Sequence, residues 1–176
     1  MDFYYSFTTL EDMNQLKLLI DFMASQDINY PRYNEWLQRA ESQLEKGEKE
    51  AILAFSKGKL VADLVTQTCK DSGLGSLREI KNARVHPLLI DRYFMTFMLK
   101  QLYKGCENFC DGMIVDVRAS QLETLRYFVK EGFIPIAKTT LYEKNMEEIT
   151  LFKPLKKDAE LLIPRAKQIV IAKSIF

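Results

Sequence analysis

The chain has 176 residues, 47% of them hydrophobic and 28% charged, which is the composition of a globular protein large enough to bury a core. Its 25 lysines and arginines nearly balance its 24 aspartates and glutamates, and the net charge of +1 provides no general attraction to nucleic acid or an anionic membrane. No apolar run approaches the roughly 18 residues that a membrane-spanning helix needs. We therefore expect neither a nucleic-acid partner nor a membrane partner.

The N-terminal part is predicted to begin with a strand at residues 3–7. Thr8 then offers a helix N-cap, with Glu11 at capping-box spacing, and apolar residues recur at helical spacing as far as Met23. A second helix is predicted after Pro31. Its apolar face consists of Tyr33, Trp36, Leu37, Ala40 and Leu44.

Three strands are predicted in the middle of the chain. Residues 51–55 and 60–65 are apolar, β-prone runs joined by a short segment that contains a glycine, which is typical of a β-hairpin. A polar loop follows at residues 69–76. Residues 77–85 then alternate as a strand does, and Pro87 ends that strand.

Helices and strands alternate in the remainder of the chain. The predicted elements are a helix at 92–104, a strand at 113–117, a helix at 120–131, and strands at 133–138 and 149–152. We expect residues 139–148 to connect the last two strands, and the β-branched run at 169–171 could add a further strand. The element order β-α-α-β-β-β-α-β-α-β-β predicts an α/β fold whose mixed, mostly antiparallel sheet has helices on both faces.

Two segments carry a resemblance to a known family. Residues 79–87 with the helix after them, and residues 115–133, resemble the two signature motifs of the GNAT superfamily of acetyl-CoA-dependent N-acetyltransferases. The first includes a V-x-P turn at Val85 and Pro87, and the second ends in an aromatic-x-x-x-Gly-Phe pattern at residues 128–133. The resemblance covers about residues 2–153. It implies a GNAT-like domain at residues 1–155, with two central parallel strands that splay apart, and a basic extension at 156–176 that packs on the domain or pairs with it.

The resemblance also implies that acetyl-CoA is the co-substrate. In the family, the coenzyme diphosphate lies on main-chain N–H groups at the start of the helix after the V-x-P turn, where the helix dipole favours anions. The family's loop has a basic residue or Gln, then Gly, then Gly or Ala, and these three positions are occupied here by Ile90, Tyr93 and Met95. The residues that the resemblance assigns to coenzyme binding are Val85, His86, Arg92, Tyr93, Phe94, Met95, Ser120 and Phe128.

Acetyl transfer needs a group that accepts the proton of the attacking amine and benefits from one that protonates the leaving thiolate. Glu79 lies six residues before Val85, the spacing of the general-base glutamate in the histone-acetyltransferase branch. The position of the family's general-acid tyrosine is occupied by Phe128. The adjacent Tyr127 is turned about 100° away around the helix, and Tyr142 could approach from the last hairpin as the acid. An ion pair of Glu79 with a neighbouring basic residue, and packing of Tyr142, are the structural alternatives.

Other polar and aromatic residues have a structural and a functional interpretation. His86 is the single histidine and suits either a turn or a base. Asp116 and Arg118 share a face of their strand, where they could pair, or Arg118 could bind an acidic substrate group. Tyr30, Tyr33 and Trp36 could line the acceptor site or form part of the core.

The basic C-terminal segment and the cysteines bear on location and partners. Residues 153–176 contain six basic and two acidic side chains, a charge of +4, which leaves −3 for the rest. This segment is either a solvated surface or a docking site for an acidic partner or nucleic acid. Three cysteines indicate reduced thiols in the cytoplasm, and the spacing of Cys106 and Cys110 does not suit zinc, so no metal site is expected.

Two functional hypotheses follow from these observations. The first is an N-acetyltransferase that moves acetyl from acetyl-CoA to a primary amine, on a small molecule or a protein, by direct attack. The second is a catalytically silent GNAT-like binding or regulatory module, which the missing glycines, Phe128 and the basic extension favour. A strand at residues 169–171 would favour a homodimer.

Overall fold

The chain forms two compact units in a computed structural model that describes residues 4–26, 30–71, 73–90 and 92–174. The first unit comprises Met1–Gln67 and Lys81–Lys104, and the second comprises Thr68–Ile80 and Gly105–Phe176. The described residues form seven strands in one sheet, with the order β1-β2-β3-β4-β5-β7-β6. Strand β4 (Leu77–Val85) contributes residues to both units.

The first unit is built from an antiparallel sheet and helices. Its elements are β1 (Tyr5–Thr9), α1 (Met13–Ala24), α2 (Tyr33–Glu45), β2 (Lys49–Ser56), β3 (Lys59–Thr68), the short 3-10 helix η1 (Pro87–Leu89) and most of α3 (Phe94–Cys106). Asp12 caps α1, because its carboxylate accepts the N–H of Gln15 at 2.8 Å. The β2–β3 turn places Lys57 and Gly58 at positive φ, as the twist of a tight hairpin requires.

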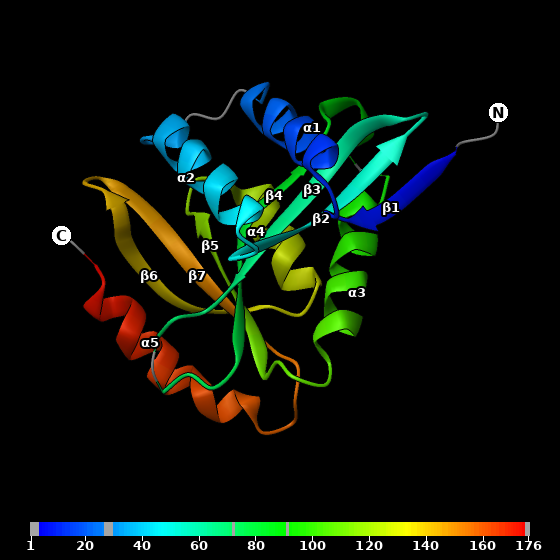
Figure 1. Ribbon diagram of the computed structural model, residues 1–176. Coiled ribbons are helices and arrows are strands. Elements are labelled where there is room, and N and C mark those ends of the chain that lie inside the picture. The colour runs from blue at the N-terminus through cyan, green and yellow to red at the C-terminus, as the bar shows by residue number, and fades with distance from the viewer. Residues whose placement is uncertain (1–3, 27–29, 72, 91, 175–176) are drawn as a thin grey trace. The chain divides into compact units, whose positions relative to one another are not determined.

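The core of the first unit lies where α1 and α2 cover one face of the hairpin β2–β3 (Figure 1). It consists of Leu16, Leu19, Met23, Leu37, Leu44, Ala51, Leu53 and Val65. The leucines and methionine of α1 recur three and four residues apart, so they share one helix face, while Ala51 and Leu53 share one face of β2. The apolar faces predicted for both helices are therefore confirmed.

The second unit is built around β5. Its elements are the first residues of β4, β5 (Gly112–Arg118), α4 (Leu122–Lys130), β6 (Ile134–Glu143), β7 (Met146–Pro154), the 3-10 helix η2 (Ala159–Leu162) and α5 (Ile163–Ala172). β5 pairs in parallel with β4, from Leu77 opposite Gly112 to Ile80 opposite Val115, and antiparallel with β7. The predicted mixed, mostly antiparallel sheet with one parallel pair is confirmed.

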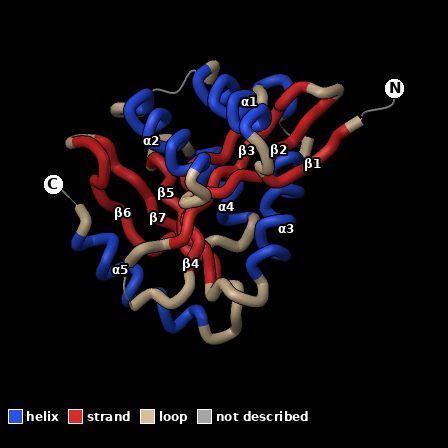
Figure 2. Tube along the Cα trace, viewed as in Figure 1, coloured by secondary structure: helices blue, strands red, loops and turns tan. Residues whose placement is uncertain are grey.

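Two expectations about the C-terminal part are wrong. Residues 139–148 are mostly strand, because β6 and β7 form one long hairpin with a turn at Lys144 and Asn145 (Figure 2). The run at 169–171 is helical and belongs to α5, although β-branched residues favour strands. Ala166 and Val170 lie one helical turn apart and are buried in the same core as Ile136 and Phe152, so packing overrides local propensity.

Helix length bears on the expected absence of a membrane partner. In the described ranges no helix combines the length and the apolar character that crossing a bilayer would demand.

Candidate functional site

The two predicted catalytic residues, Glu79 and Tyr142, both belong to the second unit. Glu79 is on β4, opposite Ile114 of β5, and its side chain is half-buried. Tyr142 is near the end of β6 and is 44% exposed. Each of the two side chains lies in a cluster of polar groups.

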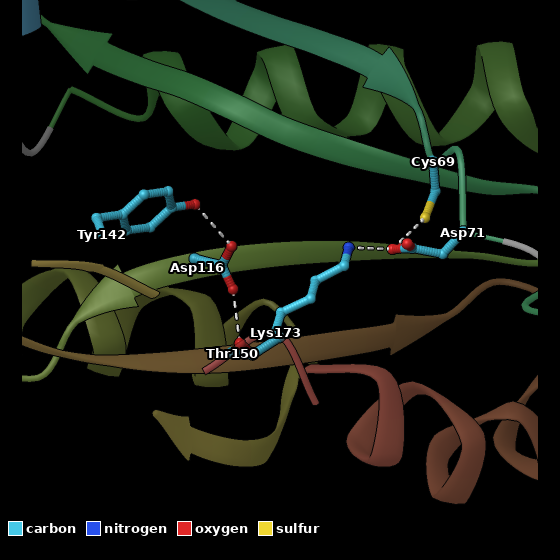
Figure 3. A network of polar contacts seen from close by, with 6 residues as sticks. All are labelled: Cys69, Asp71, Asp116, Tyr142, Thr150 and Lys173. Atoms are coloured by element: carbon cyan, nitrogen blue, oxygen red, sulfur yellow. Dashed lines mark hydrogen bonds and ion pairs between the residues drawn. The ribbon is translucent and has the colours of Figure 1, made fainter. Parts of the chain in front are cut away.

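The first cluster, which we call the Asp116 cluster, consists of Asp116, Tyr142 and Thr150 (Figure 3). The Tyr142 hydroxyl donates to one carboxylate oxygen of Asp116 at 3.1 Å, and the Thr150 hydroxyl donates to the other at 2.6 Å. Thr150 is fully buried and lies opposite Asp116 in the β5–β7 pairing. The sheet therefore fixes the carboxylate, and the carboxylate orients the exposed phenol of Tyr142.

A second polar pair lies two residues further along the same face of β5. Arg118 stands opposite Glu148 of β7, and one Glu148 carboxylate oxygen accepts the Leu141 N–H at 3.1 Å. Glu148 is only 1% exposed, and this burial raises its pKa, which the Leu141 hydrogen bond and the Arg118 charge offset only in part. The face that carries Asp116 is thus polar over two consecutive cross-strand rows.

The second cluster, which we call the Asp71 cluster, consists of Cys69, Asp71, Glu79 and Lys173. One ligand atom of each of the first three, a sulfur or a carboxylate oxygen, lies within 4.8 Å of the other two. The Cys69 thiol donates to Asp71 at 3.6 Å, and the Lys173 ammonium, at the end of α5, forms an ion pair with the same Asp71 oxygen (Figure 3). The loop after β3, strand β4 and the C-terminal helix thus bring their polar side chains together.

The pKa shifts of Cys69 and Lys173 indicate which kind of cation the Asp71 cluster can hold. Burial raises the pKa of the Cys69 thiol to about 11, and the charges of Glu79 and Asp71 add to this effect. Burial disfavours the Lys173 ammonium, yet its hydrogen bond to Asp71 and the Glu79 charge leave the lysine pKa raised overall. A metal ion would need the thiolate, which this environment disfavours. The donor set suits an ammonium better than a metal.

The first unit contains a buried carboxylate that the sequence analysis missed. Asp63 of β3 is completely buried, one of its oxygens accepts an Asn82 amide N–H at 2.6 Å, and the other has no hydrogen-bond partner among the described residues. Burial raises the Asp63 pKa to about 7, with Asn82 and Arg84 acting in the opposite direction. The available signal was an aspartate inside the apolar run at 60–65.

Tyr33 and Trp36 lie on α2 in the same unit as Asp63. Their rings stack with centroids 5.6 Å apart, and the Tyr33 hydroxyl donates to the Met23 carbonyl at 3.2 Å. Burial, with the nearby Asp63 charge, raises the Tyr33 pKa to about 12. Both rings pack against the core of the first unit, which favours the structural interpretation of this aromatic pair.

The residues that the resemblance assigns to the coenzyme differ in what they expose. In the first unit, Val85 ends β4, and the ring of His86 accepts the Leu88 N–H at 3.3 Å and so caps η1. Arg92 and Tyr93 are exposed. Phe94 is 3% exposed and contacts Tyr5 edge-on, with ring centroids 4.7 Å apart, so only its main chain is available to a ligand.

The start of α3 suits an anion through its main chain. Among the described residues, the Phe97 N–H donates to the Tyr93 carbonyl at 3.0 Å, and the N–H groups of Phe94 and Met95 lie ahead of this hydrogen bond in the chain. In the second unit, Ser120 is exposed ahead of α4, whereas Phe128 is 3% exposed and packs edge-on against Phe133.

Comparisons of the sequence with protein-family models and with curated proteins give no match. Comparison of the structure with solved structures does. A proposed acetyltransferase of the GNAT family from Desulfovibrio desulfuricans is 10% identical, covers 87% of this chain and 100% of its own, and has a TM-score of 0.75. The ribosomal-protein-S18-alanine N-acetyltransferase from Escherichia coli is 15% identical, with coverages of 87% and 95% and a TM-score of 0.67.

A third similar structure holds the coenzyme. Arabidopsis thaliana NAA60 in complex with acetyl-CoA is 14% identical, covers 86% of this chain and 98% of its own, and has a TM-score of 0.69. At such identities the likeness concerns the course of the backbone rather than the site. The element order, the parallel β4–β5 pair and these comparisons agree: the chain has the fold of the GNAT acetyltransferases.

Proposed function

We propose that the protein is an N-acetyltransferase that moves acetyl from acetyl-CoA to a primary amine by direct attack. The observation that carries the proposal is the GNAT fold, with β4 and β5 paired in parallel over Leu77–Ile80 and Gly112–Val115. Because a fold does not by itself define an activity, the polar clusters of the second unit supply the chemical argument.

Glu79 is the proposed proton acceptor. The amine must be uncharged to attack the thioester carbonyl, and a half-buried carboxylate within 4.8 Å of a second one, Asp71, is a suitable base. In the transfer, the amine nitrogen bonds to the acetyl carbon, the carbon–sulfur bond breaks, the amine proton goes to Glu79, and coenzyme A leaves as thiolate or thiol. Main-chain N–H groups near Val85 are proposed to polarise the thioester carbonyl.

Tyr142 is the proposed proton donor to the leaving sulfur. Asp116 orients its hydroxyl, but the same hydrogen bond directs the phenol proton to the carboxylate and not to the leaving sulfur. A thiol is a fair leaving group without assistance. We therefore expect Tyr142→Phe to lower kcat by about tenfold at most, with the KM for acetyl-CoA unchanged. Steady-state kinetics check this, and a loss of several orders of magnitude would contradict it.

Coenzyme binding is proposed at the first turn of α3, with the main-chain N–H groups of Phe94 and Met95 and the side chain of Arg92. Without the family's glycines this helix start can still present its backbone N–H groups to a phosphate, because Tyr93, at φ 62°, already has the left-handed conformation that glycine usually supplies. We expect calorimetric titration with acetyl-CoA to give saturable binding, weakened about tenfold in Arg92→Ala.

The alternative function is a silent binding or regulatory module. It is favoured by Phe128, whose burial against Phe133 leaves no proton donor at the family's tyrosine position. The same titration separates the two proposals, because a protein that takes up no acetyl-CoA at millimolar concentration is not an acetyltransferase. Uptake without acetylation of any amine would favour the module.

A further inference from the structure

We infer that the Asp71 cluster is a binding site for a primary alkylammonium group, and that the side chain of Lys173 occupies this site in the ligand-free protein. The inference rests on the proposed function only where it identifies the ligand as the acceptor amine. As a binding site for alkylammonium ions it stands on the geometry of the cluster alone.

The occupant of the cluster shows which chemistry it accepts. The Lys173 ammonium reaches Asp71 from a position 102 residues away along the chain. It is a primary amine on an unbranched four-carbon stem, and it lies on a carboxylate that also accepts the Cys69 thiol hydrogen. Two carboxylates, Asp71 and Glu79, meet the neutral thiol in this cluster, so the site attracts a cation.

The site is accessible, as exchange of one ammonium for another requires. The side chain of Lys173 is 51% exposed and that of Asp71 is 25% exposed. An ion pair as exposed as this one contributes little to stability, so its loss leaves the helix in place. A competing amine can therefore approach from solvent and displace the lysine.

The end of α5 has attachments other than Lys173. Ser174 accepts the Thr140 N–H at 3.3 Å, and the two hydroxyls lie 3.2 Å apart. Ala166 and Val170 are buried in the core of the second unit. Helix α5 thus remains docked when Lys173 leaves Asp71, and the lysine side chain acts as a removable occupant.

The cluster also connects amine binding with proton removal. Glu79, the proposed base, has a carboxylate oxygen within 4.8 Å of an oxygen of Asp71, the residue that holds the ammonium. An amine bound in place of Lys173 is therefore adjacent to the carboxylate that takes its proton. The negative carboxylates also stabilise the protonated form of the bound amine. The fraction of uncharged amine, and with it the transfer rate, should therefore increase as the pH rises.

The test replaces the lysine side chain with a free molecule of the same chemistry. In Lys173→Ala, n-butylammonium chloride is expected to raise the unfolding temperature by a few degrees in a saturable manner, compared with sodium chloride at equal ionic strength and pH. Three controls should show no such rise: n-butanol with the same variant, Lys173→Ala combined with Asp71→Asn, and Lys167→Ala, which removes an exposed α5 lysine outside the cluster.

The kinetic arm separates this inference from the proposed function. With n-butylamine as acceptor, Lys173→Ala should lower the acceptor KM by about twofold to sixfold and leave the KM for acetyl-CoA unchanged, because the internal competitor is gone. A rise in the unfolding temperature with n-butylammonium but no acetylation would support the site and overturn the proposed function. Acetylation without such a rise, and with an unchanged acceptor KM, would overturn the site. If Lys173→Ala does not fold, Asp71→Asn must raise the acceptor KM about tenfold for the inference to survive.

Discussion

Glutamine in place of Glu79 will lower kcat/KM for amine acetylation by about two to four orders of magnitude. The amide keeps the size and polarity of the side chain but accepts no proton, so the attacking amine loses its base. Binding of acetyl-CoA should not change, because Glu79 belongs to the polar cluster around Asp71 and not to the start of α3. Acetylation assays and calorimetric titration of the same variant measure the two quantities.

The pH dependence and a control variant make this prediction specific. The remaining activity of Glu79→Gln should increase with pH up to the pKa of the amine, because hydroxide and water then replace the carboxylate. Glu160→Gln alters an exposed glutamate of η2 in the same unit and should leave the rate unchanged. An active Glu79→Gln enzyme with an unaltered pH profile would assign the proton to another group.

Asparagine in place of Asp63 will stabilise the first unit at alkaline pH by about 1–3 kcal/mol. Burial shifts the Asp63 pKa from its ordinary 3.8 to about 7, so ionised Asp63 costs the folded state about 4 kcal/mol at pH 8. The new amide N–H group finds no acceptor, which offsets about 1–3 kcal/mol of this gain. Asn82 can still donate its hydrogen bond to the asparagine oxygen.

The sign of the pH dependence provides the check. A carboxyl group whose pKa is higher in the folded than in the unfolded state binds more protons when folded, so stability falls as the pH rises from about 4 to about 7 and then levels off. The advantage of Asp63→Asn should therefore appear at pH 8 and disappear near pH 4. Trp36, the single tryptophan, lies in the first unit and reports its urea unfolding by fluorescence. Equal stability of both proteins at pH 8 would show that ionised Asp63 does not destabilise the folded state.

Local patterns predicted much of the fold. Strand β4 was expected at residues 77–85 and is observed as Leu77–Val85, because alternation and a following proline are strong local signals. The length of the last two strands was underestimated, because the polar residues between 139 and 148 resemble those of a loop. Thr139 and Glu148, which are 8% and 1% exposed, are strand residues opposite one another, and no local rule shows that their polar side chains would be buried together.

The site was less predictable because its contacts join distant segments. Glu79 and Tyr142 could be proposed from spacing and residue type. Their neighbours could not: Asp71 meets Lys173 across 102 residues, and Asp116 meets Tyr142 across 26. Asp63 is a single charge whose partner, Asn82, is 19 residues away on another strand. Such pairs depend on strand register and helix docking, which are properties of the tertiary fold.

The attachment of α5 has a practical consequence for work with the purified protein. Lys173 and Ser174, the residues held by Asp71 and Thr140, directly follow the helix. A purification tag fused just beyond them would disturb the contacts of these two side chains, one of which belongs to the proposed acceptor site. Rates measured with such a fusion would then describe a perturbed site.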